Sequence, residues 1–454
     1  MTHVLQRLFN VRRDEVLPVL LAVLFFFCVL TALMLLRPAR EALGMQRGIE
    51  MVRWLFMGTA VITLLVNPLF GLLVSRLPRM QFITATYVFF AASLLAFYLV
   101  MVLAPEAISM TTGQIFYVWF SVFNLFVTMV FWALMADRFS LEQGKRFFGL
   151  IAVGGTCGAI FGPWLSSVLV GPWGTPALLL VSIGFLMLAL ASAWAVARIQ
   201  PELPEPTDTE SGAEAPSSPR QEQGIIGGSA WEGMRAVFRS RYLLGIAGYV
   251  VILAIMATFI YFTRLEMVAS IEGGTDQRTA LFARIDLITQ IATLVMQALI
   301  AGHLMRRFGV HITLAMLPVT AALGFLGLAI VGSLAALIAL EATFRAVQRA
   351  IMRPARETLY TVVSREDKYK SKAFIDTFVY RGGDVVGAQV EGVLGRLGMA
   401  LVGVASVAIP LALTWAVLAV WLGRAQQRIG LSHPFFHDSS HADGHQPPDR
   451  GVPR

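Results

Sequence analysis

A line of charged residues inside an otherwise apolar segment most constrains how this chain can fold. Every fourth residue of that segment is charged, at Glu341, Arg345, Arg349 and Arg353. This spacing places the four side chains on one broad face of a helix, drifting slowly around its axis. Ionisable groups are expensive inside a membrane and usually mark a substrate or ion path. The charged face is therefore expected to meet water, a partner charge or an anionic solute.

Composition and segment length predict a membrane protein. Hydrophobic residues make up 57% of the 454 residues and charged residues only 14%, unlike an average soluble protein. Apolar stretches of about twenty residues, long enough to cross a bilayer, recur along the chain. The fold class that we predict is an all-α membrane protein with twelve transmembrane helices in two six-helix halves. The helices are expected at roughly 16–36, 52–75, 82–103, 113–136, 147–170, 176–197, 242–263, 281–304, 311–331, 334–353, 373–394 and 400–423.

The basic residues predict the orientation of these helices. The first apolar run follows Arg7, Arg12 and Arg13 and lacks a cleavage site of small residues, so we expect no cleaved signal peptide. Basic loops stay in the cytoplasm, and most connections on that side carry Lys or Arg. We therefore expect a multi-pass protein of a bacterial inner membrane with both termini in the cytoplasm. The formal charge of +8 fits this topology better than binding of nucleic acid.

A polar segment in the middle of the chain divides it into two halves. Prolines there mix with Glu, Asp, Ser and Gly, a composition that cannot bury a core. We predict an N-terminal six-helix half at 1–197, a largely disordered cytoplasmic linker at 198–241, a C-terminal six-helix half at 242–423 and a disordered cytoplasmic tail at 424–454. Within the linker, residues 231–241 are expected to form a short amphipathic helix.

The tail contains histidines at a spacing of four residues, which on a helix would align metal ligands. They are His433, His437, His441 and His445. Proline and glycine in the same segment disfavour a stable helix, so we expect a solvated tail and no metal site.

Two loops resemble a motif of the major facilitator superfamily. Residues 71–79 follow the second predicted helix and residues 302–309 the eighth, and both resemble the superfamily's Gly-x-Leu-x-Asp-Arg-x-Gly loop. With six helices on each side of a linker, the resemblance implies that superfamily's fold and its alternating access. We interpret six basic residues as parts of gating and anchoring loops rather than as substrate contacts: Arg76, Arg79, Arg306, Arg307, Lys370 and Lys372.

A second repeat places charges at the ends of related helices. Residues 37–41 and 353–357 both read Arg-Pro-Ala-Arg-Glu. By our count one copy lies at the outer end of the first helix and the other at the inner end of the tenth, as inverted repeats would produce. The fourth and seventh helices also end in charge, at Asp137-Arg138 and Arg264-Leu265-Glu266. Because helix ends often carry solvated Arg and Glu, that alternative stays open for each residue taken singly.

A longer segment resembles the ATP/ADP translocase (nucleotide transporter) family of intracellular bacteria and plastids. That family's pattern is Pro-x-Lys-Glu-x-x-Tyr, then Lys-x-Lys-x-Lys-Ala-x-x-Asp, then Arg. It is matched by Pro354, Arg356, Glu357, Tyr360, Lys368, Lys370, Lys372, Ala373, Asp376 and Arg381, and further likeness lies at Leu36, Arg37, Arg40, Glu41, Trp132, Ala136, Asp137, Lys145, Arg146, Phe147 and Gly154. The resemblance implies nucleotide exchange. This chain has Arg40 and Arg356 where the family has Lys, and Asp137 where it has Asn.

The arginines in the apolar segments are the predicted ligands of an anionic solute. Guanidinium groups bind phosphate through two hydrogen bonds and are less costly to desolvate than ammonium groups. The predicted substrate-binding residues are Arg37, Arg40, Arg264, Arg345 and Arg349. Acidic residues are expected to neutralise them without solute and to act in coupling or switching: Glu41, Asp137, Glu266, Asp286, Glu341, Asp376 and Asp384. For Arg345 and Arg349, a purely structural pairing with Glu341 is the alternative.

These patterns favour a transporter over an enzyme. The sequence has no Walker phosphate-binding run and no identifiable nucleophile with a base, so we expect no catalytic residue, cofactor or metal. The main hypothesis is a secondary active transporter that moves an anionic solute, a nucleotide or phosphorylated metabolite, by alternating access. The alternatives are a proton-coupled carrier of another organic anion or amphiphile and a membrane scaffold or sensor that transports nothing. Expected partners are a small anionic substrate and the lipid bilayer, with proton coupling as an option, no nucleic acid, and a monomeric protein.

Overall fold

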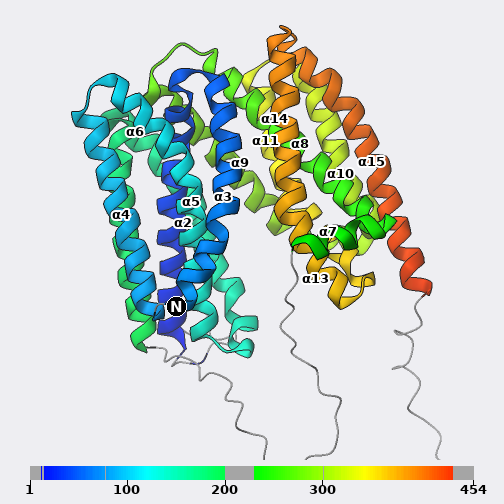
Figure 1. Cartoon of the computed structure of the whole chain (residues 1–454), viewed down its shortest axis with the longest axis horizontal. Coiled ribbons are helices and arrows are strands. Elements are labelled where there is room, and N and C mark those ends of the chain that lie inside the picture. The colour runs from blue at the N-terminus through cyan, green and yellow to red at the C-terminus, as the bar shows by residue number, and fades with distance from the viewer. Residues whose placement is uncertain (1–11, 13–14, 77, 200–229, 300, 433–454) are drawn as a thin grey trace, which may run out of the picture.

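The computed structural model describes residues 12, 15–76, 78–199, 230–299 and 301–432, and the regular elements within these residues are helices. Figure 1 shows them as a bundle of long, roughly parallel helices. The helices are α2 (Val16–Gly44), α3 (Ile49–Arg76), α4 (Arg79–Leu103), α5 (Glu106–Arg138), α6 (Leu141–Ile199), α7 (Ala230–Arg239), α8 (Arg241–Ala269), α9 (Thr275–Leu299), α10 (Ala301–Val331), α11 (Leu334–Val347), α12 (Arg353–Thr358), α13 (Arg365–Phe374), α14 (Tyr380–Arg396) and α15 (Ala400–Ser432). Four single turns, η1 (Met45–Arg47), η2 (Gln348–Met352), η3 (Leu359–Val362) and η4 (Ile375–Val379), lie between them.

The twelve predicted membrane helices are all recognisable in this arrangement. Nine helical segments of the described chain are long and apolar enough to cross a membrane. One of them, Arg146–Ile199, contains the predicted fifth and sixth helices, which meet at a bend where Gly174 has a φ of 76°. The predicted tenth and eleventh helices are interrupted by the π turns η2 and η4. These two helices are not among the nine apolar spans, because each contains charged residues and is interrupted by a π turn.

The break in the tenth helix has a local cause. Pro354 is the second residue of α12, which directly follows the π turn. Because proline has no backbone N–H and its ring crowds the preceding turn, the regular hydrogen bonding to the residue four positions earlier is lost. The chain forms a π turn here, which contains one more residue than a regular α-helical turn. Such turns are frequent at functional sites.

Several predicted boundaries differ from the structure. Helix α15 continues to Ser432, past its predicted end at residue 423, so the start of the predicted disordered tail is wrong. The amphipathic linker helix is present as α7, which packs against α13 and α8. The four tail histidines, most of the linker, and the side chains of Arg76, Arg306 and Arg307 lie outside the described residues, so those predictions stay untested.

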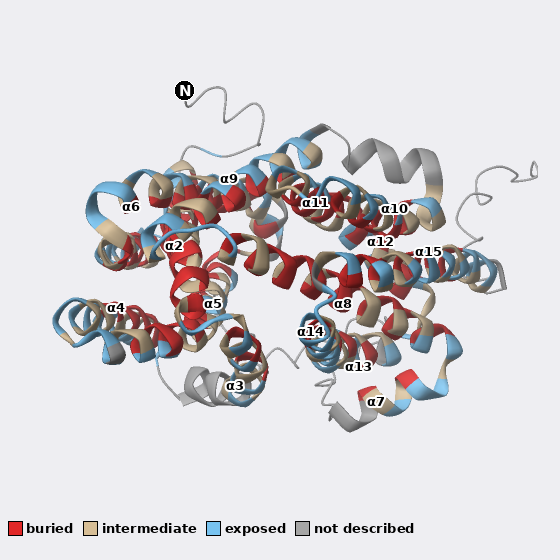
Figure 2. Cartoon of the chain, turned by 90° about the horizontal axis from the view of Figure 1, so that it is seen from above, coloured by how far each residue is buried: buried red, intermediate tan, exposed pale blue. Residues whose placement is uncertain are grey.

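Two large hydrophobic cores and one small one organise the bundle. The first contains residues from α2, α4, α5 and α6, and the second residues from α7 to α15. The third joins the two halves, because Ala42, Met45 and Tyr117 pack there with Phe262 and Phe282. Seen from above, buried positions follow the helices in the centre and exposed positions line the periphery (Figure 2). In a membrane, that apolar periphery faces lipid.

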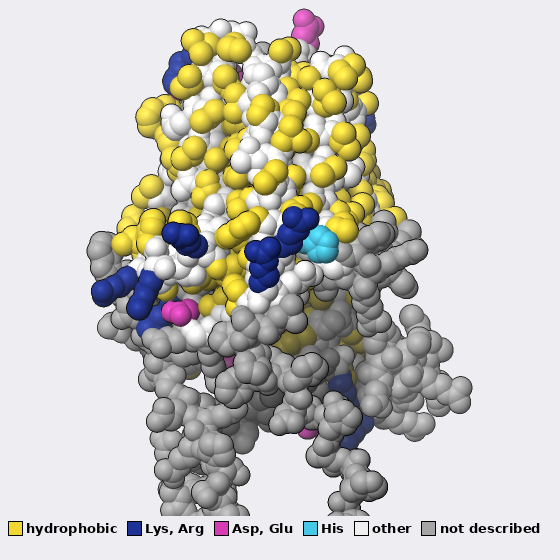
Figure 3. Space-filling view, turned by 90° about the vertical axis from the view of Figure 1, so that its right-hand side faces the viewer, with side chains coloured by type: hydrophobic (Ala, Val, Ile, Leu, Met, Phe, Trp, Pro, Cys, Tyr) yellow, Lys and Arg dark blue, Asp and Glu magenta, His cyan; other side chains and the backbone are white. Residues whose placement is uncertain are grey.

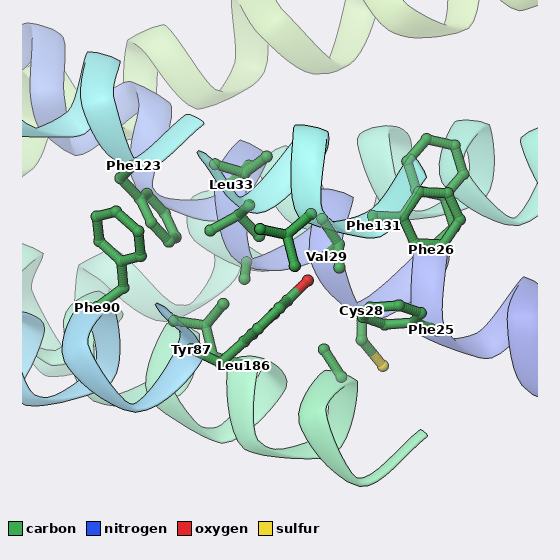
Figure 4. Close-up of a cluster of buried hydrophobic side chains, with 14 of the residues drawn as sticks. Phe25, Phe26, Cys28, Val29, Leu33, Tyr87, Phe90, Phe123, Phe131 and Leu186 are labelled. Atoms are coloured by element: carbon green, nitrogen blue, oxygen red, sulfur yellow. The ribbon is translucent and has the colours of Figure 1, made fainter. Parts of the chain in front are cut away.

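Close contacts between one pair of helices in each half bring backbones together. A Cβ atom at Gly154 of α6 would lie 2.5 Å from the carbonyl oxygen of Val23 on α2. In the other half, a Cβ atom at Gly383 of α14 would lie 2.9 Å from the carbonyl oxygen of Val251 on α8. Small residues at such crossings are typical of membrane helices. Aromatic side chains fill the first core around α2, including the stacked pair Phe26 and Phe131 (Figure 4).

The two ends of the bundle can be told apart by the chain itself. Helix α2 begins and α15 ends at the same end, at the bottom of Figure 1, and we call it the termini side. The other end carries the connections from α2 to α3 and from α8 to α9, and we call it the opposite side. The two Arg-Pro-Ala-Arg-Glu segments lie toward different ends, because residues 37–41 are near the end of α2 while residues 353–357 precede α13.

Candidate functional site

The centre of the site is a buried ion-pair network in the C-terminal half. Arg264 of α8 is only 1% exposed, and one of its terminal nitrogens lies 3.0 Å from both Asp286 Oδ1 of α9 and Glu341 Oε1 of α11. Burying a charge is tolerable only when partners replace the lost water. Three helices are therefore held together by one guanidinium group, and the prediction that Arg264 also contacts the solute stays a prediction.

Two further arginines contact the same carboxylates but stay accessible. Arg345 Nε donates to Glu341 Oε1 over 2.8 Å, and Arg37 Nε lies 3.7 Å from Asp286 Oδ2. Their side chains remain 21% and 20% exposed, in contrast to Arg264. Arg37 comes from α2, so this contact crosses between the two halves. The structural pairing of Arg345 with Glu341 is thus present, and it leaves part of the guanidinium group open.

Arg349 differs from these arginines because its hydrogen-bond partner is neutral. Its terminal nitrogen donates to the side-chain oxygen of Gln290 over 2.5 Å. It also lines a cavity of about 320 Å³ between the halves. The walls come from α2, α6 and α9: Phe26, Leu30, Met34, Ala152, Gly155, Thr156, Ala159, Ile160, Gln290, Thr293, Leu294 and Gln297. A cationic group at the edge of a largely apolar cavity with a few amides and hydroxyls is suited to an anionic organic solute.

Arg40 and Glu41 form a second network between the halves. Arg40 donates to Glu41 Oε1 over 2.8 Å and lies 3.7 Å above the ring of Tyr117. The other oxygen of Glu41 accepts from the hydroxyl of Tyr261 on α8, and the two tyrosine hydroxyls are 2.6 Å apart. Arg40 is therefore neutralised by its neighbour. Tyr117 and Tyr261 were missed in the sequence because tyrosine near a helix end gives no periodic signal.

The central cluster has more positive than negative groups. Five guanidinium groups, those of Arg37, Arg40, Arg264, Arg345 and Arg349, accompany three carboxylates, those of Glu41, Asp286 and Glu341. At neutral pH this is an excess of two positive charges beside the cavity. Glu341 Oε2 and two nitrogens of Arg264 also lack a hydrogen-bond partner within the described part of the chain. Buried polar atoms without partners are costly, and a bound polar molecule would relieve that cost.

A different cluster closes the opposite side of the bundle. Arg53 of α3 contacts Glu391 of α14 at 2.7 Å, Glu50 at 2.5 Å and Glu266 at 3.8 Å. Further hydrogen bonds join the halves on this side, from Gln46 to Thr275 and from the Thr175 backbone to Asp276. Of this cluster, only Glu266 was predicted as a coupling residue. Glu391 carries a charge within an apolar segment, which was a signal that the prediction overlooked.

Three ion pairs at the termini side each join residues of the same half. Arg79 pairs with Asp137, Arg146 contacts Glu15 at 2.9 Å, and Arg356 contacts Asp376 at 3.1 Å. Glu15 precedes the first membrane helix; burial alone would raise its pKa, but hydrogen bonds from the Arg12 backbone, Gln143 and Arg146 lower it below the usual glutamate value. Asp137 and Asp376 are thus paired far from the central cluster.

A second cavity, with a more polar lining, lies in the C-terminal half near this side. It measures about 520 Å³ and is lined by Leu253, Gln348, Met352, Arg353, Arg356, Glu357, Asp376, Tyr380 and Arg381. Lys372 and Glu357 pair at 2.5 Å close by, and Arg381 pairs with Asp384 at 3.2 Å. Lys370 packs its backbone against Gly233 of α7. Predicted residues therefore separate into a central group and a termini-side group, while Glu266 alone of them belongs to the cluster around Arg53.

The sequence also offers Asn67, Asn124 and Gln297 as weaker candidates for contacts to a base or sugar, each equally explained by a hydrogen bond between helices, and they have different positions. Gln297 lines the central cavity, whereas Asn124 is exposed on α5, away from the cavity lining. The side chain of Asn67 lies outside the described residues. Gln290, which the sequence analysis did not single out, is the amide that holds Arg349.

Two helical halves with a cavity between them, bordered here by Arg349, are typical of membrane transporters. Residues 19–352 match the Major Facilitator Superfamily, and the chain belongs to that family. The sequence-based recognition of this family and the prediction of an all-helical fold are confirmed.

Two curated relatives are similar to this chain at low identity. ADP,ATP carrier protein 1 of Chlamydia muridarum is 24% identical over 339 residues, which cover 66% of this chain and 61% of the relative. ADP,ATP carrier protein 1 of Chlamydia trachomatis is 24% identical over 352 residues, covering 69% of this chain and 64% of the relative. The chain thus spans somewhat less than two thirds of the length of these carriers.

Solved structures of transporters share the fold. The POT family transporter PepTSo superposes with a TM-score of 0.61 at 12% identity, covering 92% of this chain and 99% of the other. A bacterial homologue of the iron transporter ferroportin gives a TM-score of 0.61 at 11% identity, with 90% and 98% covered. At such identities the likeness concerns the fold alone. Family and fold are those of transporters and not of enzymes.

Proposed function

We propose that this protein moves an anionic solute, a nucleotide or phosphorylated metabolite, across the membrane by alternating access. The observation that carries this proposal is the excess of two positive charges beside a cavity between the halves. A polyanion would neutralise that excess. The similarity to ADP,ATP carriers supports a nucleotide as the solute.

Arg349 is the residue that we assign to first contact with the solute. Because Gln290 leaves its charge uncompensated, a phosphate group can bind Arg349 without first displacing a carboxylate. Arg345 and Arg37 are partly exposed and would bind the solute next. Arg345 would then give up its contact with Glu341, and Arg37 its contact with Asp286. The guanidinium fork suits phosphate through two parallel hydrogen bonds. Exchange of internal for solute contacts would then bias the two halves toward the alternative arrangement.

Uptake by purified protein in liposomes tests this proposal. Labelled ATP, ADP and inorganic phosphate are offered with and without the same compound inside the vesicles. Arg349→Gln is expected to weaken solute affinity by roughly ten- to hundredfold, because it removes a charge-assisted hydrogen bond. Arg349→Lys should recover part of the affinity, since it restores charge without the fork. Arg239→Gln on the exposed face of α7 is the matched control.

The results can contradict the proposal in two ways. Wild-type affinity in a well-folded Arg349→Gln variant would remove this residue from the site. Absence of uptake or exchange of every anion by folded wild-type protein would favour a membrane scaffold or sensor instead.

One observation favours proton coupling as a second candidate function. Arg53 is shared by Glu50, Glu266 and Glu391, and among the described residues Arg396 is the other arginine paired within this cluster. Three carboxylates against two arginines leave one excess negative charge, which a proton can neutralise. Glu391→Gln is therefore expected to reduce uptake driven by a proton gradient while leaving solute exchange intact. Full gradient response in this variant would argue against Glu391 as the coupling group.

We also propose that the termini side faces the cytoplasm of a bacterium, because the basic connections favour this orientation. Ser217 lies in the linker, and a cysteine at that position should be labelled by an impermeant reagent only after the membrane is opened. Labelling in intact cells would reverse the assignment of the two sides.

A further inference from the structure

A groove on the outer, lipid-facing surface lies between α10 and α15. It measures about 800 Å³ and is lined by Ala315, Val319, Ala416, Val417, Val420, Trp421, Arg424, Ala425, Arg428 and Ile429. Its lining contains no acidic residue. Val417 and Val319, which are 71% and 47% exposed, border the groove. Ala315 and Ala416 have small side chains, which makes the groove deeper between them.

Two arginines lie at one end of this groove. Arg424 and Arg428 are one helical turn apart on α15, so both point to the same side of the helix. Both are exposed, and neither has an ion pair or hydrogen bond to another described side chain. Figure 3 shows this face of the molecule, where basic side chains gather at the lower edge of a hydrophobic surface. Arginines at such a boundary attract anionic headgroups.

The length of the groove fits one leaflet of a bilayer. Ala416 and Arg428 are twelve residues apart, which corresponds to roughly 18 Å along a helix. Half of the hydrocarbon core of a membrane is about 15 Å thick. A lipid chain lying along the groove would therefore end near the bilayer midplane while its phosphate reaches the two arginines.

We propose that this groove is a binding site for one anionic phospholipid of the leaflet on the termini side. Its phosphate group pairs with Arg424 and Arg428, and an acyl chain lies over Ala416 and Ala315 against Trp421. The site is separate from the central cavity, and its occupancy does not depend on the proposed solute. A lipid held between α10 and α15 would connect two helices of the C-terminal half at their membrane surface.

Lipid binding to the purified protein tests this proposal. Native mass spectrometry and thermal unfolding are followed while phosphatidylglycerol or phosphatidylcholine with identical acyl chains is added. We expect phosphatidylglycerol to bind and stabilise the wild type more strongly. The double variant Arg424→Gln/Arg428→Gln should bind it roughly thirtyfold more weakly, given the attraction of two arginines to an anionic headgroup. Arg198→Gln, an exposed arginine at the end of α6, should bind like the wild type.

A second variant separates seating in the groove from attraction by charge alone. Ala416→Phe keeps both arginines and adds a ring on the lipid-facing surface, where it fills the groove without entering the core. We expect this variant to lose the preference for phosphatidylglycerol. Unchanged lipid binding in either variant would overturn the proposal, as would equal stabilisation by phosphatidylcholine, or an equal stabilisation by inorganic phosphate that the double variant Arg424→Gln/Arg428→Gln loses.

Discussion

The cluster around Arg264 and the cluster around Arg53 use the same residue types in opposite proportions. The first has an excess of arginines and borders a cavity, whereas the second has an excess of carboxylates and joins the halves at the opposite side. The centre of each cluster is buried, but Glu50 and Arg396 of the second are more than half exposed, so the two clusters differ in depth as well as in charge balance. The difference in charge balance suggests that a positive excess marks the place of an anionic solute and that a negative excess marks a contact controlled by protons.

The largest expected effect comes from removing the centre of the first cluster. Arg264→Gln would leave the carboxylates of Asp286 and Glu341 buried without their main partner. Breaking a buried ion pair from one side costs about 3–5 kcal/mol, so we expect poor expression and a clearly lower melting temperature. Thermal unfolding in detergent measures this. A stable Arg264→Gln protein would show that the network is not structural.

The next effect separates solute binding from stability within the same cluster. Arg345→Gln should lower solute affinity by roughly ten- to hundredfold, because a charge-assisted hydrogen bond is worth about 1.5–3 kcal/mol. Its stability should change less than that of Arg264→Gln, since Arg264 still neutralises Glu341. Two quantities are measured for Arg345→Gln and for the double variant Glu341→Gln/Arg345→Gln: the expression level and the rise in melting temperature on adding solute. Wild-type affinity in a well-folded double variant would contradict an anion site here.

A smaller effect is expected at the second cluster. Arg53→Gln leaves Glu391 buried beside Glu266 without its arginine, which should cost about 1–3 kcal/mol at neutral pH. Protonation can relieve this cost, so the difference from the wild type should shrink as the pH is lowered. Melting temperatures at two pH values test it. A difference independent of pH would mean that the arginine acts through packing, for example on Phe262.

The smallest effect concerns a carboxylate outside both clusters. The pKa of Glu15 is lowered in the folded protein, so its pairing stabilises the fold above the unfolded pKa and is lost as the pH falls below about 4.3. Glu15→Gln should therefore flatten the acid limb of the stability curve slightly and change neither solute affinity nor gradient response. An acid limb equal to that of the wild type would assign it to other carboxylates.

The sequence by itself determined the class of this protein and most of its helices. Apolar segments of bilayer length must become helices in lipid, because helices satisfy every backbone hydrogen bond within the segment. Charged residues within these apolar segments are conspicuous because they are costly in lipid. Their position alone therefore identified four of them: Arg264, Asp286, Glu341 and Arg345. The sequence also predicted the linker helix α7, because its own residues form an amphipathic pattern.

Only the tertiary structure decided which of these charges work together. Arg37 and Asp286 are far apart in sequence and meet because α2 packs against α9 between the halves. The burial of Arg264 and its role in joining three helices also appear only in the fold, since burial depends on the surrounding helices and not on its own segment. Arg53 and Glu391 likewise each belong to a different half, and no local pattern links them. Charge can be read along a chain, but charge balance is a property of residues brought together by packing.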